Sequence, residues 1–255
     1  MGLFCLTDHD TLGGADEVAT HLPEVTVLPG LELSTEAHRR TVHLLVYGVK
    51  PGPARESLEA RLAELRGLRR ARIFAICERL THLGIRLDAQ AILDEAGHGT
   101  PGRPHVARAL VAAGFCTSVR EAFERFLNDR GPAHTPSPRL SVEEGLGLAT
   151  AAGARVALAH PHLLGPPEFV KACCVSWKPL GLSGLEALYG FYGERQRATW
   201  AGLAREVGLV ATAGSDYHGV SVVPDVANPG VDVTPAEFEA LCHWLELPAA
   251  SLAPS

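Results

Sequence analysis

Short apolar runs of strand length alternate with polar segments in the first fifty residues. The runs are Leu3–Leu6, Val25–Leu28 with Leu31 beyond a Pro-Gly pair, and Val42–Tyr47. They are rich in aliphatic and β-branched residues and are bounded by Gly, Pro and charged residues, as strands usually are. The segment Ala15–His21 between the first two runs suits a helix. This part of the chain therefore predicts three strands and one helix.

The pattern changes at Pro51-Gly52-Pro53, after which apolar positions recur at helical spacing. Arg55 to Leu83 predicts one long helix, and Gly84 is a plausible stop signal for it. Shorter helices are expected at Asp88–Ala96, Pro104–Ala113 and Val119–Leu127. Residues 52–139 therefore predict an all-helical segment.

Strands and helices alternate again from residue 140 onward. The expected helices are Val142–Ala152, Glu194–Val207 and Pro235–Leu245, and the expected strands are Val156–Ala159, Leu185–Tyr189 and Leu209–Ala213. Strands that alternate with helices favour a parallel sheet or a barrel. We therefore expect an α/β fold in which residues 1–51 and 140–255 form the barrel domain and residues 52–139 form a helical insertion, or cap, domain.

Composition and charge narrow the class of protein. The chain has 255 residues, of which 46% are hydrophobic and 20% charged, so it can form a packed core and is not a disordered chain. The net charge of −6 argues against a general nucleic-acid surface, and no stable nucleic-acid partner is expected. No apolar run approaches the roughly 18 residues of a membrane span, and the start does not resemble a signal peptide. We expect a cytoplasmic protein with no membrane partner, whose six scattered cysteines are reduced and buried; the oligomeric state is open.

Four of the apolar runs are followed by polar residues of types that can bind metal ions. These are Asp8, His9 and Asp10 after the first run, Glu32 after the second, His160 after Val156–Ala159, and Asp216 and His218 after Val210–Ala213. The carboxyl ends of parallel strands converge on one face of a sheet or barrel, so these side chains are expected to meet. His43 differs because it opens its strand, and His105 begins a helix of the insertion.

Histidines and carboxylates without cysteine suit Zn, Mn or Fe ions. Two or three divalent ions could share a bridging carboxylate, activate water and bind both oxygens of a phosphoryl displacement. Each residue also has a plain structural interpretation. His9 could cap a turn, Glu32 could be a solvated loop acid, and His105 could be an ordinary residue in the first turn of a helix. Their combination favours a metal site.

Six stretches of the chain carry these residues. They are Thr7–Thr11, Pro29–Glu32, Val42–Gly48, Gly102–Arg108, Ala159–Pro161 and Gly214–Gly219. In this order they resemble the PHP (polymerase and histidinol phosphatase) family of metal-dependent phosphoesterases. The Arg-Pro-His helix start and the helical insertion are most similar to one branch of that family, which hydrolyses nucleoside 3′,5′-bisphosphates and short 5′-phosphorylated oligonucleotides.

The resemblance implies a distorted seven-stranded β/α barrel with a trinuclear metal site. By position, Glu32 is similar to the bridging ligand of the first two metals, Asp216 to a ligand of the first, His43 and His105 to ligands of the second, and His9 and His218 to ligands of the third.

The resemblance implies roles for two further residues, and the residues themselves suggest a role for Asp8 and Asp10. His160 would be a ligand or a proton donor to the leaving oxygen. Arg103 looks like a phosphate clamp, because a guanidinium suits bidentate contact. Asp8 and Asp10 are expected to orient the turn or the ligands rather than to bind metal.

The chain departs from the family at its start. Family members open with a strand that carries His-x-His and then an Asp, some tens of positions before the Thr-Asp-His-Asp motif, which starts here at residue 7. By this resemblance we expect the first strand of the barrel to be absent from the chain, together with three ligands. We interpret this as a start placed too late, rather than a strand supplied by a partner or a loss of activity, because the remaining ligands are all present.

The expected function is hydrolysis of phosphoesters, with nucleoside 3′,5′-bisphosphates or short 5′-phosphorylated oligonucleotides as substrates. One alternative is a PHP-fold protein with impaired catalysis that binds nucleotides or metals, since the His-x-His ligands are absent. Another is a PHP phosphatase for a different substrate, such as histidinol phosphate or a DNA 3′ end.

Overall fold

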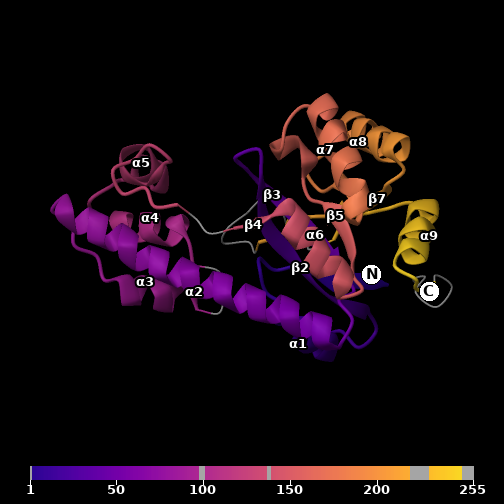
Figure 1. The fold of residues 1–255 in the computed structure, drawn as a ribbon, viewed down its shortest axis with the longest axis horizontal. Coiled ribbons are helices and arrows are strands. Elements are labelled where there is room, and N and C mark those ends of the chain that lie inside the picture. Colours follow the sequence, from indigo (N-terminus) through magenta and orange to yellow (C-terminus); the bar gives the residue numbers. More distant parts are fainter. Residues whose placement is uncertain (1, 98–100, 137–138, 219–229, 249–255) are drawn as a thin grey trace. The chain divides into compact units, whose positions relative to one another are not determined.

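The structure is a computed structural model that describes residues 2–97, 101–136, 139–218 and 230–248 (Figure 1). The chain divides into two compact units, residues 1–59 with 140–255 and residues 60–139. That residues 52–139 form a cap over a site stays a prediction. None of the described helices is long and apolar enough to cross a membrane.

The first unit contains a curled, seven-stranded sheet with the order β1-β2-β3-β5-β6-β7, and β4 pairs with β2 (Figure 1). The predicted α/β class is thereby confirmed. The strands are β1 (Leu3–Leu6), β2 (Thr26–Ala37), β3 (Arg40–Tyr47), β4 (Leu140–Ser141), β5 (Arg155–Leu158), β6 (Leu182–Tyr189) and β7 (Val210–Gly214).

The sheet is mixed, which corrects the expectation of a parallel one. Strand β3 runs antiparallel to both β2 and β5, whereas β5, β6 and β7 are parallel. The reason is a tight hairpin between β2 and β3. His38 and Arg39 both have positive φ, of 51° and 61°, which is the geometry of two-residue hairpin loops.

Strand β2 is one continuous element of twelve residues. Pro29-Gly30 lies inside this element, between the apolar run Val25–Leu28 and Leu31. A Cβ on Gly30 would lie 2.4 Å from the Cys5 sulfur and 2.5 Å from the Val46 carbonyl oxygen. Glycine therefore lets β1 and β3 approach β2 closely on both sides, and it does not end the strand.

Helices of the first unit lie against this sheet or against one another (Figure 1). They are α1 (Ala15–His21), α6 (Val142–Ala151), η2 (Pro161–Leu163), α7 (Pro167–Trp177), η3 (Lys178–Leu180), α8 (Glu194–Val207) and α9 (Pro235–Trp244). Helix α7 packs on α8 and η3. Helix α6 packs on β2, β3 and β5 through Leu146 and Ala149, which are fully buried. The expected helices at 142–152, 194–207 and 235–245 agree with α6, α8 and α9 to within one residue.

Every element that the structure describes between residues 60 and 139 is helical. Helix α2 (Pro53–His82) begins in the first unit, and α3 (Ala89–Ala96), α4 (Arg103–Ala112), α5 (Val119–Ala122) and the π-helical turn η1 (Phe123–Leu127) follow it. Their apolar faces form a core around Ile76, Leu80, Leu93 and Leu110. The amphipathic spacing in the sequence thus predicts these helices correctly.

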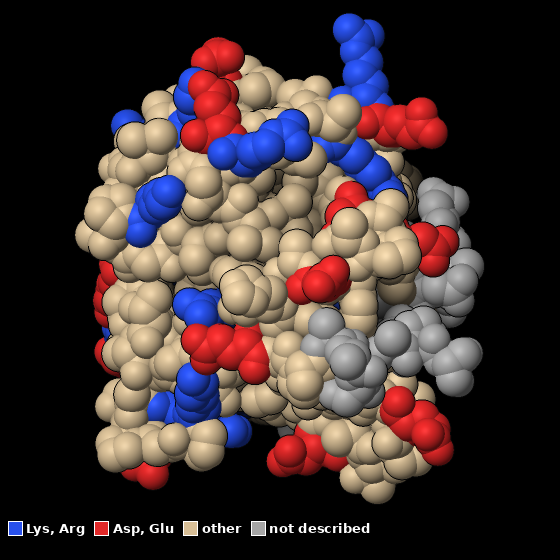
Figure 2. All heavy atoms as spheres, turned by 90° about the vertical axis from the view of Figure 1, so that its right-hand side faces the viewer, with Lys and Arg blue, Asp and Glu red and all other residues tan. Residues whose placement is uncertain are grey.

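The surface charges are of mixed sign, and the cysteines are unpaired. On the face in Figure 2, Lys and Arg lie beside Asp and Glu across the described residues, without a continuous basic area. The six cysteines are unpaired. Five are buried as expected, and Cys5 is partly exposed.

Candidate metal centre

Glu32 lies at the centre of a cluster of imidazoles. Its side chain is buried in the middle of β2, with a residue exposure of 5%. One carboxylate oxygen, Oε1, is 2.6 Å from His43 Nδ1 and 3.1 Å from His160 Nε2. The other, Oε2, is 3.8 Å from His9 Nε2. Ligand atoms of His9, Glu32 and His43 all lie within 4.8 Å of one another, which is close enough to hold one metal ion.

Strand register, rather than a strand end, brings Glu32 and His43 together. Glu32 does not end its strand and His43 does not open its own, which corrects both expectations. His43 pairs with Ser34 across the antiparallel ladder. Because side chains alternate along a strand, Glu32 and Ser34 share a face, so the cross-strand neighbour of Ser34 also faces Glu32.

The loop after β1 carries His9 over Glu32. The Glu32 N–H donates to the Asp8 carbonyl at 3.1 Å, and the Asp10 N–H donates to the Glu32 carbonyl at 3.0 Å. The buried Asp10 carboxylate accepts the Ser34 N–H at 2.8 Å, while Asp8 is exposed. The loop is thus bound to β2 on both sides of His9. These contacts suit an orienting role for Asp10, which stays a prediction.

His160 enters the cluster from the end of β5. Its ring Nε2 lies 3.1 Å from His43 Nδ1 as well as near Glu32. Its φ of 24° is unusual for a residue with a side chain. Asp10 and Asp216 also have positive φ, of 54° and 52°. Left-handed backbone at three candidate residues fits the tendency of functional sites to carry local strain.

Asp216 and His218 follow β7 and lie beside His9. The His218 ring centroid is 5.6 Å from that of His9. His218 Nδ1 is 2.9 Å from the Asp216 carbonyl oxygen, and the Tyr189 hydroxyl donates to Asp216 Oδ2 at 2.9 Å. The structure thus brings together residues from β2, β3 and the loops after β1, β5 and β7.

Two predicted site residues, Arg103 and His105, belong to the other unit. They begin α4, where the Gly102 N–H donates to His105 Nδ1 at 3.3 Å. Arg103 donates to the Asp129 carboxylate at 2.7 Å and to the Leu127 carbonyl at 2.9 Å. Their roles in metal and phosphate binding stay predictions.

The charges at the centre favour the metal-binding protonation states of Glu32 and His9. Burial raises the pKa of the Glu32 carboxyl, but hydrogen bonds from His160 and His43 outweigh it and hold that pKa well below its ordinary value. Burial lowers the pKa of His9. Burial also lowers that of His160, yet the hydrogen bond and charge of Glu32 raise it overall. An ionised carboxylate beside a neutral imidazole is a donor set that fits a divalent cation.

Sequence analysis missed Glu186 and Tyr189, two residues of β6 beside the centre. Glu186 is 3% exposed, and its carboxylate accepts the His160 N–H at 2.6 Å. Burial raises its pKa to about 7. A Cβ on Gly214 would lie 2.1 Å from Glu186 Oε1, so this glycine makes room for the carboxylate. One signal could have found it, because Glu186 is the single charged residue in the apolar strand Leu182–Tyr189.

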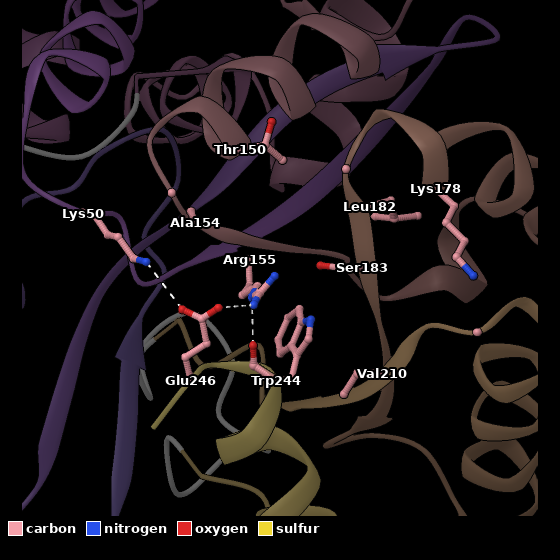
Figure 3. Close-up of a pocket in the computed structure, with 13 residues that line it drawn as sticks. Lys50, Thr150, Ala154, Arg155, Lys178, Leu182, Ser183, Val210, Trp244 and Glu246 are labelled. Carbon is pink, nitrogen blue, oxygen red and sulfur yellow. Dashed lines mark hydrogen bonds and ion pairs between the residues drawn. The ribbon is translucent and has the colours of Figure 1, made fainter. Parts of the chain in front are cut away.

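A pocket of about 570 Å³ lies at the opposite ends of the same strands (Figure 3). Arg155 Nε donates to the Trp244 carbonyl at 2.8 Å, and Lys178 Nζ donates to the Val207 carbonyl at 2.7 Å. Both carbonyls end helices, so these cations stabilise the C-termini of α9 and α8. Glu246 accepts from Arg155 and pairs with Lys50 (Figure 3). The cations of this pocket therefore have structural partners, and the metal-ligand cluster lies elsewhere.

Comparisons with known proteins indicate a class of reaction for the chain. No family model matches the chain. It is 29% identical to the 3′,5′-nucleoside bisphosphate phosphatase of Chromobacterium violaceum, over 99% of this chain and 88% of that protein. It is also 29% identical to a 5′-3′ exoribonuclease of Haemophilus influenzae, over 86% of this chain and 80% of that protein. The chain is a homologue of phosphoester hydrolases.

Solved structures agree with these relatives. A Bifidobacterium adolescentis protein described as a "putative metal-dependent phosphoesterase" superposes with a TM-score of 0.75 and 26% identity, over 94% of this chain and 85% of that one. An amidohydrolase from C. violaceum, with bound sulfate and no metal, has a TM-score of 0.77 and 27% identity, over 92% and 82% of the chains. The names are consistent with the PHP family, and the predicted resemblance is confirmed.

Proposed function

We propose that this chain is a metal-dependent phosphoesterase that hydrolyses nucleoside 3′,5′-bisphosphates or short 5′-phosphorylated oligonucleotides. The observation that carries the proposal is the Glu32 carboxylate, buried within 3.8 Å of three imidazoles. The names of the two curated relatives support the substrate class.

Two or three divalent ions, Mn, Zn or Fe, fit the donor set. Glu32 would bridge two ions, and the other ligands would be His9, His43, His105, Asp216 and His218. Such ions, when bound, lower the pKa of water and neutralise charge on the phosphoryl oxygens. The protein would hold the ligands in place through Asp10, Tyr189 and the β2–β3 register.

His160 would act on the leaving group. Its ring Nε2 lies 3.1 Å from Glu32 Oε1, so the imidazole is placed beside the ligands, where it could donate a proton to the leaving oxygen. Arg103 would bind a phosphate group of the substrate through its guanidinium. Asp8 would help to orient the loop that carries His9, since its carbonyl accepts the Glu32 N–H.

The test measures metal content and phosphate release on the same samples. Protein loaded with Mn²⁺ and desalted is analysed by plasma mass spectrometry and assayed with adenosine 3′,5′-bisphosphate. We expect Glu32→Gln and Asp216→Asn to lose metal and to lower turnover roughly 100-fold or more, with little change in thermal unfolding. Glu143→Gln, at an exposed position of α6 outside the cluster, is the matched control.

The outcomes separate the alternatives. Unchanged turnover in Glu32→Gln would overturn the proposal. Bound metal without phosphate release from any nucleotide would instead indicate a binding protein. Release from histidinol phosphate but not from nucleotides would keep the enzyme class and change the substrate.

A further inference from the structure

Large apolar side chains are exposed on the loops after β5, β6 and β7. They are Leu163, Phe191 and Tyr217, with exposures of 65%, 49% and 39%. The loops after β5 and β7 are also those that bring His160 and Asp216 to the metal centre. The loops after β5 and β7 thus carry both exposed apolar side chains and candidate ligands, and an apolar group that stays exposed gains nothing from burial in the fold.

Phe191 is the outer end of a row of aromatic rings that starts at the centre. The ring centroids of His43 and His160 are 5.0 Å apart, and those of His160 and Tyr189 are 6.4 Å apart. Tyr189 and Phe191 follow at 5.5 Å, with ring planes inclined by 44°. The hydroxyl of the same Tyr189 donates to Asp216. Phe191 therefore packs against Tyr189, and Tyr189 contacts Asp216 of the metal centre.

The surroundings hold the Phe191 loop in place. The Gly190 N–H donates to the Gly214 carbonyl at 2.8 Å, and the Tyr192 N–H donates to the Tyr189 carbonyl at 3.0 Å. The Tyr192 and Tyr189 ring centroids are 4.9 Å apart, and the Tyr192 hydroxyl lies 2.7 Å from His162 Nδ1. A ring that is ordered before binding loses little conformational entropy when a ligand stacks on it.

We propose that Phe191, supported by Tyr189, stacks on the nucleobase of a substrate whose phosphate binds at the metal centre. The inference rests on the proposed function and adds a specificity residue to it. An aromatic face stacks on any base, because every base has a π-face. The phenyl ring has no hydrogen-bonding group, so Phe191 recognises the presence of a base and not its identity.

The test compares two substrates that differ only in the base. These are adenosine 3′,5′-bisphosphate and the abasic ribose 3′,5′-bisphosphate, assayed with the Mn²⁺-loaded protein. We expect the wild type to prefer the nucleotide by about 10-fold or more in kcat/KM. Phe191→Leu, which keeps an apolar side chain but removes the ring, should abolish this preference through KM, and Phe191→Tyr should restore it. Val175→Ala, at an exposed apolar position of α7, is the control.

Each outcome decides the inference. A preference that survives in Phe191→Leu overturns it. An equal loss on both substrates shows that Phe191 only supports its loop, as a protein-docking or packing residue would, and also overturns it. If the wild type hydrolyses neither substrate, the proposed function fails by itself. Calorimetric titration with adenosine 5′-monophosphate then tests the stacking role of Phe191. Binding weakened about 10-fold in Phe191→Leu supports the stacking role, and equal or absent binding overturns it.

Discussion

The main-chain N–H of His160 donates a hydrogen bond of 2.6 Å to the buried carboxylate of Glu186. This bond links the end of β5 to the middle of β6, and the other Glu186 oxygen lies against Gly214 of β7. One carboxylate therefore contacts two strand ends that carry candidate site residues. His160 has an unusual backbone conformation where its ring lies 3.1 Å from Glu32.

Removal of the Glu186 carboxylate should weaken metal binding. In Glu186→Ala the buried His160 N–H loses its acceptor, and His160 is no longer held toward Glu32. We expect the affinity for Mn²⁺ to fall roughly 10- to 100-fold, as for other residues that orient ligands. Glu186→Gln keeps an acceptor oxygen and should retain most of the affinity. Calorimetric Mn²⁺ titration of both variants is the measurement, and equal affinities for Ala and wild type would contradict this role.

Glu186 should also make the stability of the metal-free protein depend on pH. Burial raises its pKa from 4.5 to about 7, so the folded state retains a proton that the unfolded state releases. The stability contribution is therefore full below pH 4.5 and is lost as the pH rises to about 7. Relative to Glu186→Gln, the free energy of unfolding of the wild type should decrease by at most about 3 kcal/mol across this window. Urea denaturation at several pH values measures it, and a difference that does not vary with pH would refute it.

The Tyr189 hydroxyl and the Phe191 ring should affect different properties. Tyr189→Phe removes the hydrogen bond to Asp216 and keeps the ring that supports Phe191. We expect about 10-fold weaker Mn²⁺ binding with an unchanged preference for substrates that carry a base. Phe191→Leu should show the reverse pattern. Metal titration and kcat/KM ratios on both variants test this separation, which fails if Tyr189→Phe alters the base preference.

Two glycine substitutions should change stability in opposite directions. Gly30→Ala places a Cβ within 2.5 Å of a backbone oxygen of β3 and should destabilise the protein by about 1–3 kcal/mol. Gly67→Ala lies at an exposed position inside α2, where a Cβ meets nothing within 4 Å. It should stabilise that helix by about 1 kcal/mol, since alanine has the higher helix propensity. Chemical denaturation compares the pair, and a neutral Gly30→Ala would show that β1 and β3 can move apart.

Local patterns in the sequence predict the elements well and their pairing less well. The helical spacing of Leu58, Leu62 and Leu65 predicts α2, and all three side chains are buried. The Pro29-Gly30 pair lies inside β2, which is paired with β1 and β3 on either side of it. His43 is expected to open its strand because most of the apolar run follows it, yet the ladder extends back to Arg40. A ladder pairs polar residues as readily as apolar ones, so apolar runs underestimate strand length.

The sequence by itself determined the candidate ligands. Each of them follows an apolar run, and their motifs occur in the order of the resembled family; these ligands are His9, Glu32, His160, Asp216 and His218. Only the tertiary structure decided which of them meet. Glu32 and His160 lie 128 residues apart in the chain and 3.1 Å apart in space. That distance depends on strand order, on the antiparallel register of β3 and on the hydrogen bond from His160 to Glu186. These long-range pairings follow from the packing of the whole sheet, and no short sequence pattern encodes them.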